Sequence, residues 1–382
     1  MTFDFTSSID RSGTGSLKWN KYAGKDVLPF WVADMDFRSP PSVEEALRAR
    51  VDHGIYGYTV PYKSVEDSVI DYMRDAHGLE IEREWIVWMP GLVPALNTAS
   101  RAFESPGDGV MTFTPVYPPF LTAPEWQDKE LIALPLKLED GRYTFDWEKM
   151  EAAVKPNTRL LLLCNPHNPV GRVFSREELE KLVDFSERHD LIIVSDEIHC
   201  DLILEPELKH HSILSFGERA SKRSLTLMAP SKTYNIPGLS TSFIIIPNPR
   251  LRMRFQRASR GMITEINCFG YVGCEAAYRG GEPWRKELIE VLRTNRDRLY
   301  EFVAERMPRV KMLPMEATYL AWLDVRDLGL DKPAAWFESH GIGLSDGALF
   351  GTPGYVRFNF GCSSEWMEKG LQRLGAAYDA IA

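Results

Sequence analysis

The sequence is poor in cysteine and in clustered metal ligands. Its five cysteines show no C-x-x-C spacing, and an odd set of this kind predicts neither a disulfide framework nor a zinc site. None of its eight histidines forms an H-x-x-x-H pair, the spacing that places two ligands on one face of a helix. We therefore interpret the cysteines as buried free thiols and expect no metal.

Long apolar runs and an excess of basic charge are also missing. No segment approaches the roughly 18 apolar residues that span a bilayer, and the N-terminus lacks the basic and apolar regions of a signal peptide. The net charge of −9 argues against a nucleic-acid or anionic-membrane surface. One dense basic stretch, residues 250–260, is interpreted as the polar face of an amphipathic helix. We expect a cytoplasmic protein without nucleic-acid or membrane partners.

Pattern changes along the 382 residues predict three regions of an α/β protein. Residues 1–44, rich in Gly, Ser and Pro, form an N-terminal arm. At its end, Ser42 and Glu45 predict the N-terminal cap of a first helix. Strands and helices then alternate in the βαβ manner over residues 45–280, including a strand at 241–247, which predicts a large domain with a mainly parallel sheet. A long helix, two alternating strands and a final helix predict a smaller C-terminal domain over 281–382, against which we expect the arm to pack.

Three short apolar runs of the large domain end in polar residues. Residues 160–164 lead to Asn168, residues 191–194 lead to Asp196, and residues 225–228 lead to Lys232. Continuous apolar segments of this kind predict parallel strands buried on both faces, and ligands of such sheets bind beyond the carboxyl ends of the strands. We therefore expect the three side chains to converge. Each also has an ordinary alternative: a surface charge for Lys232, a turn or cap for Asp196, and an Asn-Pro turn for Asn168.

A lysine, an aspartate and an asparagine at neighbouring strand ends suit pyridoxal 5′-phosphate. A desolvated lysine has a lowered pKa and attacks carbonyls, so it can form an imine with the cofactor aldehyde. The aspartate can keep the pyridine nitrogen protonated, and the asparagine can hydrogen-bond the phenolic oxygen. The sequence therefore predicts a site for this cofactor.

The motifs Asn-Pro-x-Asn-Pro-x-Gly at 165–171, Ser-Asp-Glu at 195–197 and Ser-Lys at 231–232 resemble those of the fold-type I, class I/II aminotransferase superfamily in order and spacing. The resemblance covers nearly the whole chain. Residues 9–19, 31–37, 56–59 and 231–236 are similar to the cystathionine β-lyase branch, the MalY/PatB-like C–S lyases. The resemblance implies the fold-type I architecture, bound pyridoxal 5′-phosphate and a homodimer with shared active sites.

This resemblance also implies roles for the cofactor-binding residues. Lys232 is the imine-forming catalytic lysine, Asp196 the catalytic partner of the ring nitrogen, and Asn168 the donor to the phenolic oxygen. Tyr117 stacks on the cofactor ring, its alternative being a turn-anchoring tyrosine. His199 stands where many transaminases have a tyrosine, which favours the lyase branch.

For the cofactor phosphate, the resemblance implies Ser231 and backbone N–H groups at the start of a helix, those of Gly91, Leu92 and Val93. Two positions depart from the family pattern. Ala229 stands where many relatives have a phosphate-binding serine, and Ser240 where aspartate aminotransferases have an arginine. The phosphate must therefore depend on fewer side chains than in those relatives.

Three further residues are assigned to the substrate. Arg357 matches the arginine that holds the α-carboxylate, its alternative being an internal salt bridge. Ala33, in the stretch 31–37, is assigned to substrate binding. Tyr58 matches a tyrosine that reaches across the dimer interface to the cofactor phosphate of the neighbouring subunit, and we expect it to contribute to catalysis and substrate binding there.

The leading hypothesis is a C–S β-lyase that converts L-cystathionine or related cysteine S-conjugates into a thiol (homocysteine from cystathionine), pyruvate and ammonia. The competing hypotheses are an aminotransferase of a neutral or aromatic amino acid and a cofactor-binding regulatory protein with residual lyase activity. All of them share the first steps, because proton removal from Cα precedes the divergence.

Overall fold

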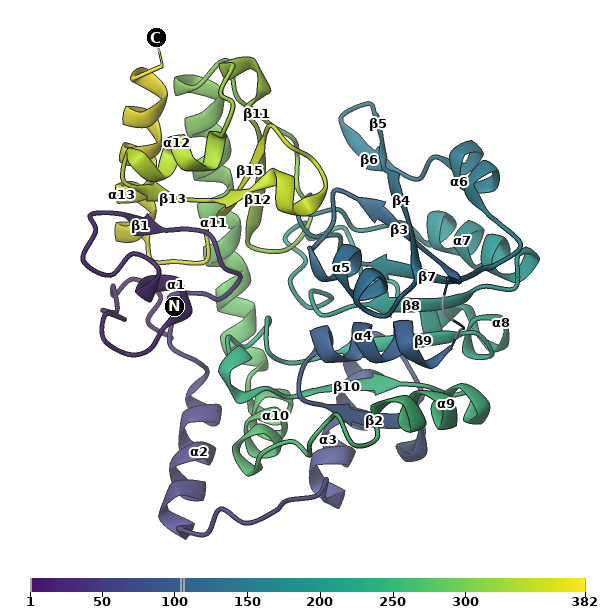
Figure 1. Ribbon diagram of the computed structural model, residues 1–382. Helices are drawn as coiled ribbons and strands as arrows, with labels where there is room; N and C mark the ends of the chain where they lie inside the picture. Colours follow the sequence, from purple (N-terminus) through teal and green to yellow (C-terminus); the bar gives the residue numbers. More distant parts are fainter. Residues whose placement is uncertain (1, 104, 106, 382) are drawn as a thin grey trace.

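A seven-stranded sheet forms the centre of the computed structural model, which describes residues 2–103, 105 and 107–381 (Figure 1). The strand order is β2-β10-β9-β8-β7-β3-β4. Six strands run in one direction, and β10, which pairs antiparallel with both β2 and β9, runs in the opposite direction. Their bounds are β2 (Ile86–Met89), β3 (Gly109–Thr114), β4 (Glu130–Pro135), β7 (Thr158–Cys164), β8 (Ile192–Asp196), β9 (Ser224–Met228) and β10 (Ser242–Ile245).

The orientation of β10 corrects the prediction of a continuous βαβ alternation. A parallel strand needs a crossover connection, usually a helix, that returns the chain to the same end of the sheet. Between β9 and β10 the chain forms only turns and the short 3₁₀ segment η3 (Pro237–Leu239). It therefore enters β10 at the end where β9 finished, and the strand is antiparallel.

Apolar side chains cover both faces of the sheet, as the continuous apolar runs predicted. Leu160 and Leu162 of β7 face one core, which contains α4, α5 and α9, and Leu161 and Leu163 face the other. All four are fully buried. The surrounding helices are α3 (Lys63–His77), α4 (Leu92–Ala102), α5 (Pro119–Trp126), α6 (Trp147–Ala153), α7 (Arg176–Arg188), α8 (Glu218–Ser221), α9 (Pro249–Ser259) and α10 (Cys268–Gly280).

A second, antiparallel sheet of order β11-β12-β15-β14 lies in the C-terminal part. The long helix α11 runs between the two parts of the molecule, and α13 lies beside it (Figure 1). The bounds are α11 (Glu282–Arg306), β11 (Lys311–Met312), β12 (Leu320–Asp324), α12 (Pro333–Ser339), β13 (Ile342–Gly343), β14 (Ser345–Asp346), η5 (Gly347–Phe350), β15 (Tyr355–Asn359) and α13 (Ser364–Asp379).

The N-terminal arm contains α1 (Leu17–Asn20) and β1 (Leu28–Pro29), and β1 pairs in parallel with β13. The domain boundaries after residues 44 and 280 stay a prediction, and the outermost residues of that division, 1 and 382, lie outside the described residues. A small hairpin of β5 (Lys137–Glu139) and β6 (Arg142–Thr144) completes the strands. None of the helices in the described part of the chain combines the length and apolar character needed to cross a membrane.

The predicted cap of the first helix is wrong. Helix α2 (Pro41–His53) begins one residue before Ser42, its N-cap is Pro40, and no side chain caps it. Proline suits the first helical position because its missing N–H would have no partner there. The buried hydroxyl of Ser42 has no hydrogen-bond partner among the described residues. By contrast, Ser175 and Glu178 form a complete capping box at the start of α7.

Candidate active site

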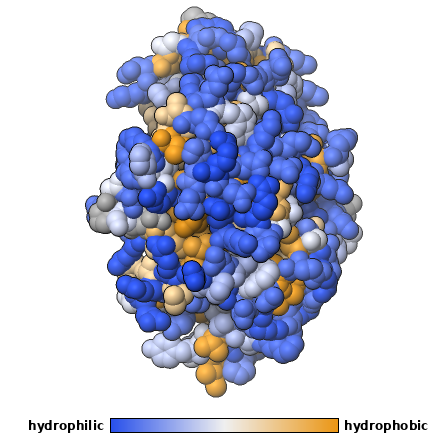
Figure 2. Space-filling view, turned by 90° about the vertical axis from the view of Figure 1, so that its right-hand side faces the viewer, coloured by the Kyte–Doolittle hydropathy of each residue, from blue (hydrophilic) through white to orange (hydrophobic). Residues whose placement is uncertain are grey.

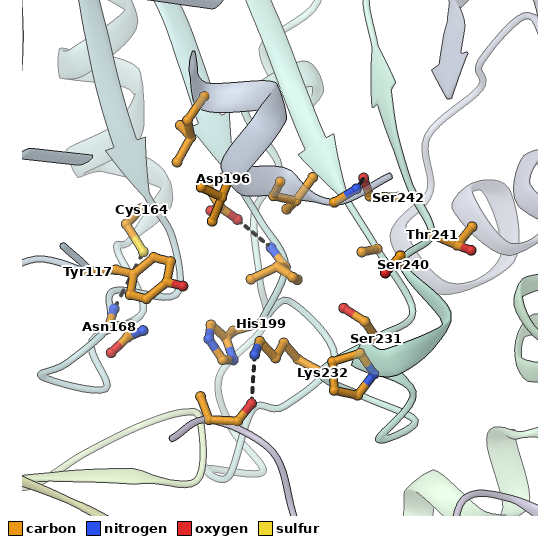
Figure 3. A pocket seen from close by; sticks show the side chains of 18 of the residues that line it. Tyr117, Cys164, Asn168, Asp196, His199, Ser231, Lys232, Ser240, Thr241 and Ser242 are labelled. Atoms are coloured by element: carbon orange, nitrogen blue, oxygen red, sulfur yellow. Dashed lines mark hydrogen bonds between the residues drawn. The ribbon is translucent and has the colours of Figure 1, made fainter. Parts of the chain in front are cut away.

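A cavity opens where β7, β8 and β9 end and α4 begins (Figure 3). It contains about 800 Å³ of space free of atoms, including space open to solvent. Most of the residues predicted from the sequence line it: Ala33, Gly91, Leu92, Val93, Tyr117, Asn168, Asp196, His199, Ser231 and Lys232. The convergence arises because the parallel strands present their carboxyl ends at one edge of the sheet.

Lys232 projects into this cavity from the loop after β9. Its Nζ donates a hydrogen bond of 2.6 Å to the backbone carbonyl of Ala33, which belongs to the N-terminal arm (Figure 3). Burial and, secondarily, the positive charge of Arg357 lower the pKa of Lys232 to about 8, against the opposing influence of Asp34 and Asp196. Near neutral pH a useful fraction of this amine is therefore unprotonated.

The pKa values of Asp196 and His199 are shifted in opposite directions. Burial raises the pKa of Asp196 to about 7, although Oδ1 accepts a hydrogen bond of 3.1 Å from the N–H of Ile198. Burial and the nearby charges of Lys232 and Arg357 lower the pKa of His199 to about 3, so its ring is neutral. The buried Nδ1 of His199 has no partner among the described residues. Both side chains are thus suited to a polar group placed in the cavity.

Arg357 and Asn168 meet beside the cavity. One guanidinium nitrogen of Arg357 donates to Oδ1 of Asn168 at 2.9 Å, and the other donates to the carbonyl of Trp31 at 2.8 Å. Arg357 is only 4% exposed, yet no carboxylate among the described residues forms a salt bridge with it. Burial lowers its pKa to about 10. The alternative of an internal salt bridge is therefore not what the structure shows, and the unpaired cation suits an incoming anion.

The far end of the cavity is rich in hydroxyls and contains the start of α4. Sequence reasoning named Ser231 there, but the structure adds Ser240, Thr241 and Ser242 to the lining (Figure 3). Ser242 accepts a hydrogen bond of 3.1 Å from the N–H of Gly91 and donates to the carbonyl of Met89, so it joins β10 to the start of α4. No side chain caps α4, which leaves its positive end facing this region. Such an end suits a phosphate.

Tyr117 and Tyr58 occupy very different places. Tyr117 is half-buried at the cavity edge beside Asn168, whose carbonyl accepts the Tyr117 N–H at 3.1 Å, and burial raises the pKa of its hydroxyl (Figure 3). Tyr58 does not line the cavity of its own chain and is fully exposed, in the segment between α2 and α3. The predicted role of Tyr58 across a dimer interface stays a prediction.

Sequence reasoning missed two groups that only the fold brings together. Tyr319 of the C-terminal part donates to the carbonyl of Ala33 at 3.0 Å, although nothing near Tyr319 in sequence suggested a site. His77, Cys200 and Asp201 bring three possible metal-ligating atoms within 4.8 Å of one another, a grouping that sequence spacing could not reveal. His77 Nε2 and Asp201 Oδ1 already pair there at 3.1 Å.

A sequence profile described as "Aminotransferase class I and II" matches residues 25–374. The chain belongs to the class I and II aminotransferase family. Cystathionine β-lyase PatB of Bacillus subtilis (strain 168) is 40% identical over 98% of this chain and 99% of its own length. Protein MalY of Escherichia coli (strain K12) is 31% identical over 99% of this chain and 100% of its own length. This family member thus matches both relatives from end to end.

Solved structures agree with this assignment. Cystalysin from Treponema denticola, which contains a pyridoxal 5′-phosphate cofactor, is 37% identical, with a TM-score of 0.96 over 100% of both chains. OvoB is 44% identical, with a TM-score of 0.96 over 98% of this chain and 99% of the other. The fold predicted from the sequence is thereby confirmed as that of the class I and II aminotransferases, with a mainly parallel sheet flanked by helices.

Proposed function

We propose that this protein is a pyridoxal 5′-phosphate-dependent C–S β-lyase acting on L-cystathionine or related cysteine S-conjugates. The observation that carries the proposal is the half-buried, low-pKa Lys232 in the cavity, together with a buried Arg357 that lies beside the cavity without an anionic partner and acts electrostatically on Lys232. Similarity over the full length to proteins named cystathionine β-lyase supports the reaction class.

The residues of the cavity fit the cofactor. The Nδ1 of His199 is a buried polar atom without a partner, and Asp196 is an acid whose burial disfavours its charge unless a cation pairs with it. A protonated pyridine nitrogen would pair with Asp196. The uncapped start of α4 and the hydroxyls of Ser231 and Ser240 fit a phosphate. Lys232 supplies the primary amine that an aldehyde requires.

Each residue of the site has a separate role in the proposed reaction. When bound, the cofactor supplies an aldehyde that combines with amines and a protonated ring that withdraws electrons from the substrate Cα. Arg357 would hold the substrate carboxylate through its guanidinium group and so orient the substrate in the site. The amine of Lys232 takes the Cα proton, and Asp196 keeps the ring nitrogen protonated throughout. Asn168 links the two ends of the site through its hydrogen bond to Arg357.

The overall reaction consumes one water. The Cβ–S bond breaks and sulfur leaves with the electron pair as a thiolate, which becomes a thiol on protonation. Water replaces nitrogen at Cα, so an S-substituted cysteine and water give a thiol, pyruvate and ammonium. No oxidant is required.

A homodimer is part of the proposal. Tyr58 belongs to a run of exposed apolar and aromatic side chains at the end of α2 and after it, which includes Val51, Ile55, Tyr56 and Val60. Figure 2 shows hydrophobic side chains protruding at the lower end of the molecule, where Figure 1 places this segment. Exposed apolar surface of this kind is typical of an interface. A second copy of the chain packed there would bring Tyr58 toward the partner's cavity.

The product balance tests the proposal. Purified protein loaded with the cofactor is mixed with L-cystathionine, and pyruvate, ammonia and free thiol are measured with Lys232→Ala as the inactive control. Pyruvate and thiol in equal amounts, without an added 2-oxo acid, are expected. Turnover that requires a 2-oxo acid would instead establish an aminotransferase. A panel of S-substituted cysteines, assayed in the same way, would identify the preferred thiol substituent.

A further inference from the structure

One backbone oxygen accepts hydrogen bonds from two side chains of the site, the half-buried Lys232 and the buried Tyr319. The carbonyl of Ala33 accepts from Nζ of Lys232 at 2.6 Å and from the hydroxyl of Tyr319 at 3.0 Å. The two donors come from different parts of the fold, since Lys232 follows β9 and Tyr319 precedes β12. Tyr319 is 1% exposed, so its hydroxyl has no access to bulk water that could replace this bond.

The backbone next to Tyr319 is strained. Thr318 adopts a φ of 72°, and a β-branched residue in the left-handed region is a genuine outlier. Such conformations cost about 1–3 kcal/mol and persist only where the surroundings enforce them. Here the N–H of Thr318 donates to the carbonyl of Leu202, and its hydroxyl accepts from the N–H of Leu320. These two hydrogen bonds hold residue 318 in its conformation directly before Tyr319.

The segment that carries the Ala33 carbonyl is fixed on both sides. Asn359 donates to the carbonyls of Val32 and Asp34, the residues immediately before and after Ala33. Asn235, three positions after Lys232, accepts from the N–H of Met35 and donates to its carbonyl. The Ala33 oxygen therefore has a defined position relative to the loop of Lys232.

We propose that Tyr319 is a positioning residue that holds the Ala33 carbonyl as the resting place of the free Lys232 amine during turnover. The inference rests on the proposed catalytic role of Lys232. Because the hydroxyl hydrogen of Tyr319 points at the same oxygen, the positive end of its dipole lies near the amine and disfavours the ammonium form. Tyr319 thereby fixes the position of the Lys232 amine and favours its unprotonated form, which can take a proton.

Other charges act on the two side chains and must stay constant in any test. Lys232 is influenced by Arg357, Asp34 and Asp196. The Tyr319 hydroxyl, whose pKa burial raises, is influenced by Asp34 and Arg357, and its ring lies 6.2 Å from the neutral ring of His199. Tyr319→Phe removes one hydroxyl and leaves all of these charges in place.

The test titrates Lys232 in the cofactor-free protein. Reductive methylation with formaldehyde, followed by mass spectrometry of the peptide containing residue 232, gives the methylation rate as a function of pH. The wild-type midpoint is expected near 8, and Tyr319→Phe should raise it by about half a pH unit. In the loaded enzyme, kcat should fall about tenfold while KM changes less than about twofold, and the acid-side midpoint of the kcat profile should move in the same direction.

Tyr72→Phe is the matched control, because it removes another buried tyrosine hydroxyl, which contacts the hydroxyl of Tyr234 at 3.3 Å and the carboxylate of Asp201. Neither of these groups is among those that shift the pKa of Lys232. The control should leave the methylation midpoint at the wild-type value. A second variant guards against misfolding: 3,5-difluorotyrosine at position 319 is a stronger donor and should lower the midpoint. Coincident midpoints for wild type and either Tyr319 variant would overturn the inference. Since methylation needs neither cofactor nor substrate, failure of the lyase proposal leaves a distinct signature, namely shifted midpoints without pyruvate release.

Discussion

Replacing Arg357 by methionine should separate substrate binding from stability. The side chain is buried without an anionic partner, and a shift of its pKa from 12.5 to about 10 corresponds to about 3 kcal/mol against the folded state at neutral pH. Methionine removes this penalty but also removes the hydrogen bonds to Asn168 and Trp31. The carbonyl of Trp31 keeps a donor, since the hydroxyl of Ser345 lies 2.8 Å away. The two contributions nearly cancel, so unfolding free energy in denaturant should change by less than about 1 kcal/mol.

Catalysis should respond far more strongly. Removing one partner of a buried, hydrogen-bonded charge pair costs about 2–5 kcal/mol, or roughly 30- to 4,000-fold in kcat/KM at 1.4 kcal/mol per factor of ten. The assay compares an S-substituted cysteine with its decarboxylated amine analogue. Wild type should prefer the amino acid by that factor, and Arg357→Met should abolish the preference. An unchanged preference would show that the carboxylate is held elsewhere, and a loss of several kcal/mol of stability would show that Arg357 has an internal anionic partner after all.

The other predictions concern the remaining site residues. Lys232→Ala should eliminate the absorbance of the lysine–cofactor adduct and reduce turnover by several orders of magnitude with an unchanged circular dichroism spectrum; undiminished turnover would contradict its role. Burial raises the pKa of Asp196 from 3.8 to about 7, so the cofactor-free protein should lose about 4 kcal/mol of stability as pH rises between those values. Urea unfolding of Asp196→Asn should lack this loss, and parallel curves for the two proteins would refute it. Mixing inactive Tyr58→Phe and Lys232→Ala chains should restore part of the activity if sites are shared, and confirmed but inactive heterodimers would exclude sharing.

The part of the site that could be predicted from the sequence lies at the ends of strands. Asn168, Asp196 and Lys232 each follow a continuous apolar run, and the parallel order of β7, β8 and β9 brings such ends together whatever the details of packing. Arg357 was assigned from the family resemblance, and the structure buries it beside the cavity, while its substrate-binding role stays a prediction. Local patterns with a strong physical cause therefore predicted which of these side chains converge on the cavity.

The rest depends on contacts between distant residues. Tyr319, which directly precedes β12, reaches the site only because the fold places it against the N-terminal arm, and its partner Ala33 is 286 positions away. Thr241 and Ser242 line the cavity because β10 is antiparallel, which the expected βαβ alternation did not allow. A capping rule predicted Ser42 as the N-cap, but helix α2 begins one residue earlier, at Pro41. No spacing rule within the sequence contains this information.

The hydrogen bond between Arg357 and Trp31 joins residues 326 positions apart and has a consequence for biosynthesis. The last strand of the central sheet, β10, ends at Ile245, so a chain emerging from the ribosome contains all seven strands before Arg357 is made. Lys232, Asp196 and the start of α4 are then already present. The aldehyde-binding half of the site is therefore synthesised first, and the carboxylate-binding half follows only when nearly the whole chain is complete. Truncated products therefore lack Arg357, the residue proposed to hold the substrate carboxylate.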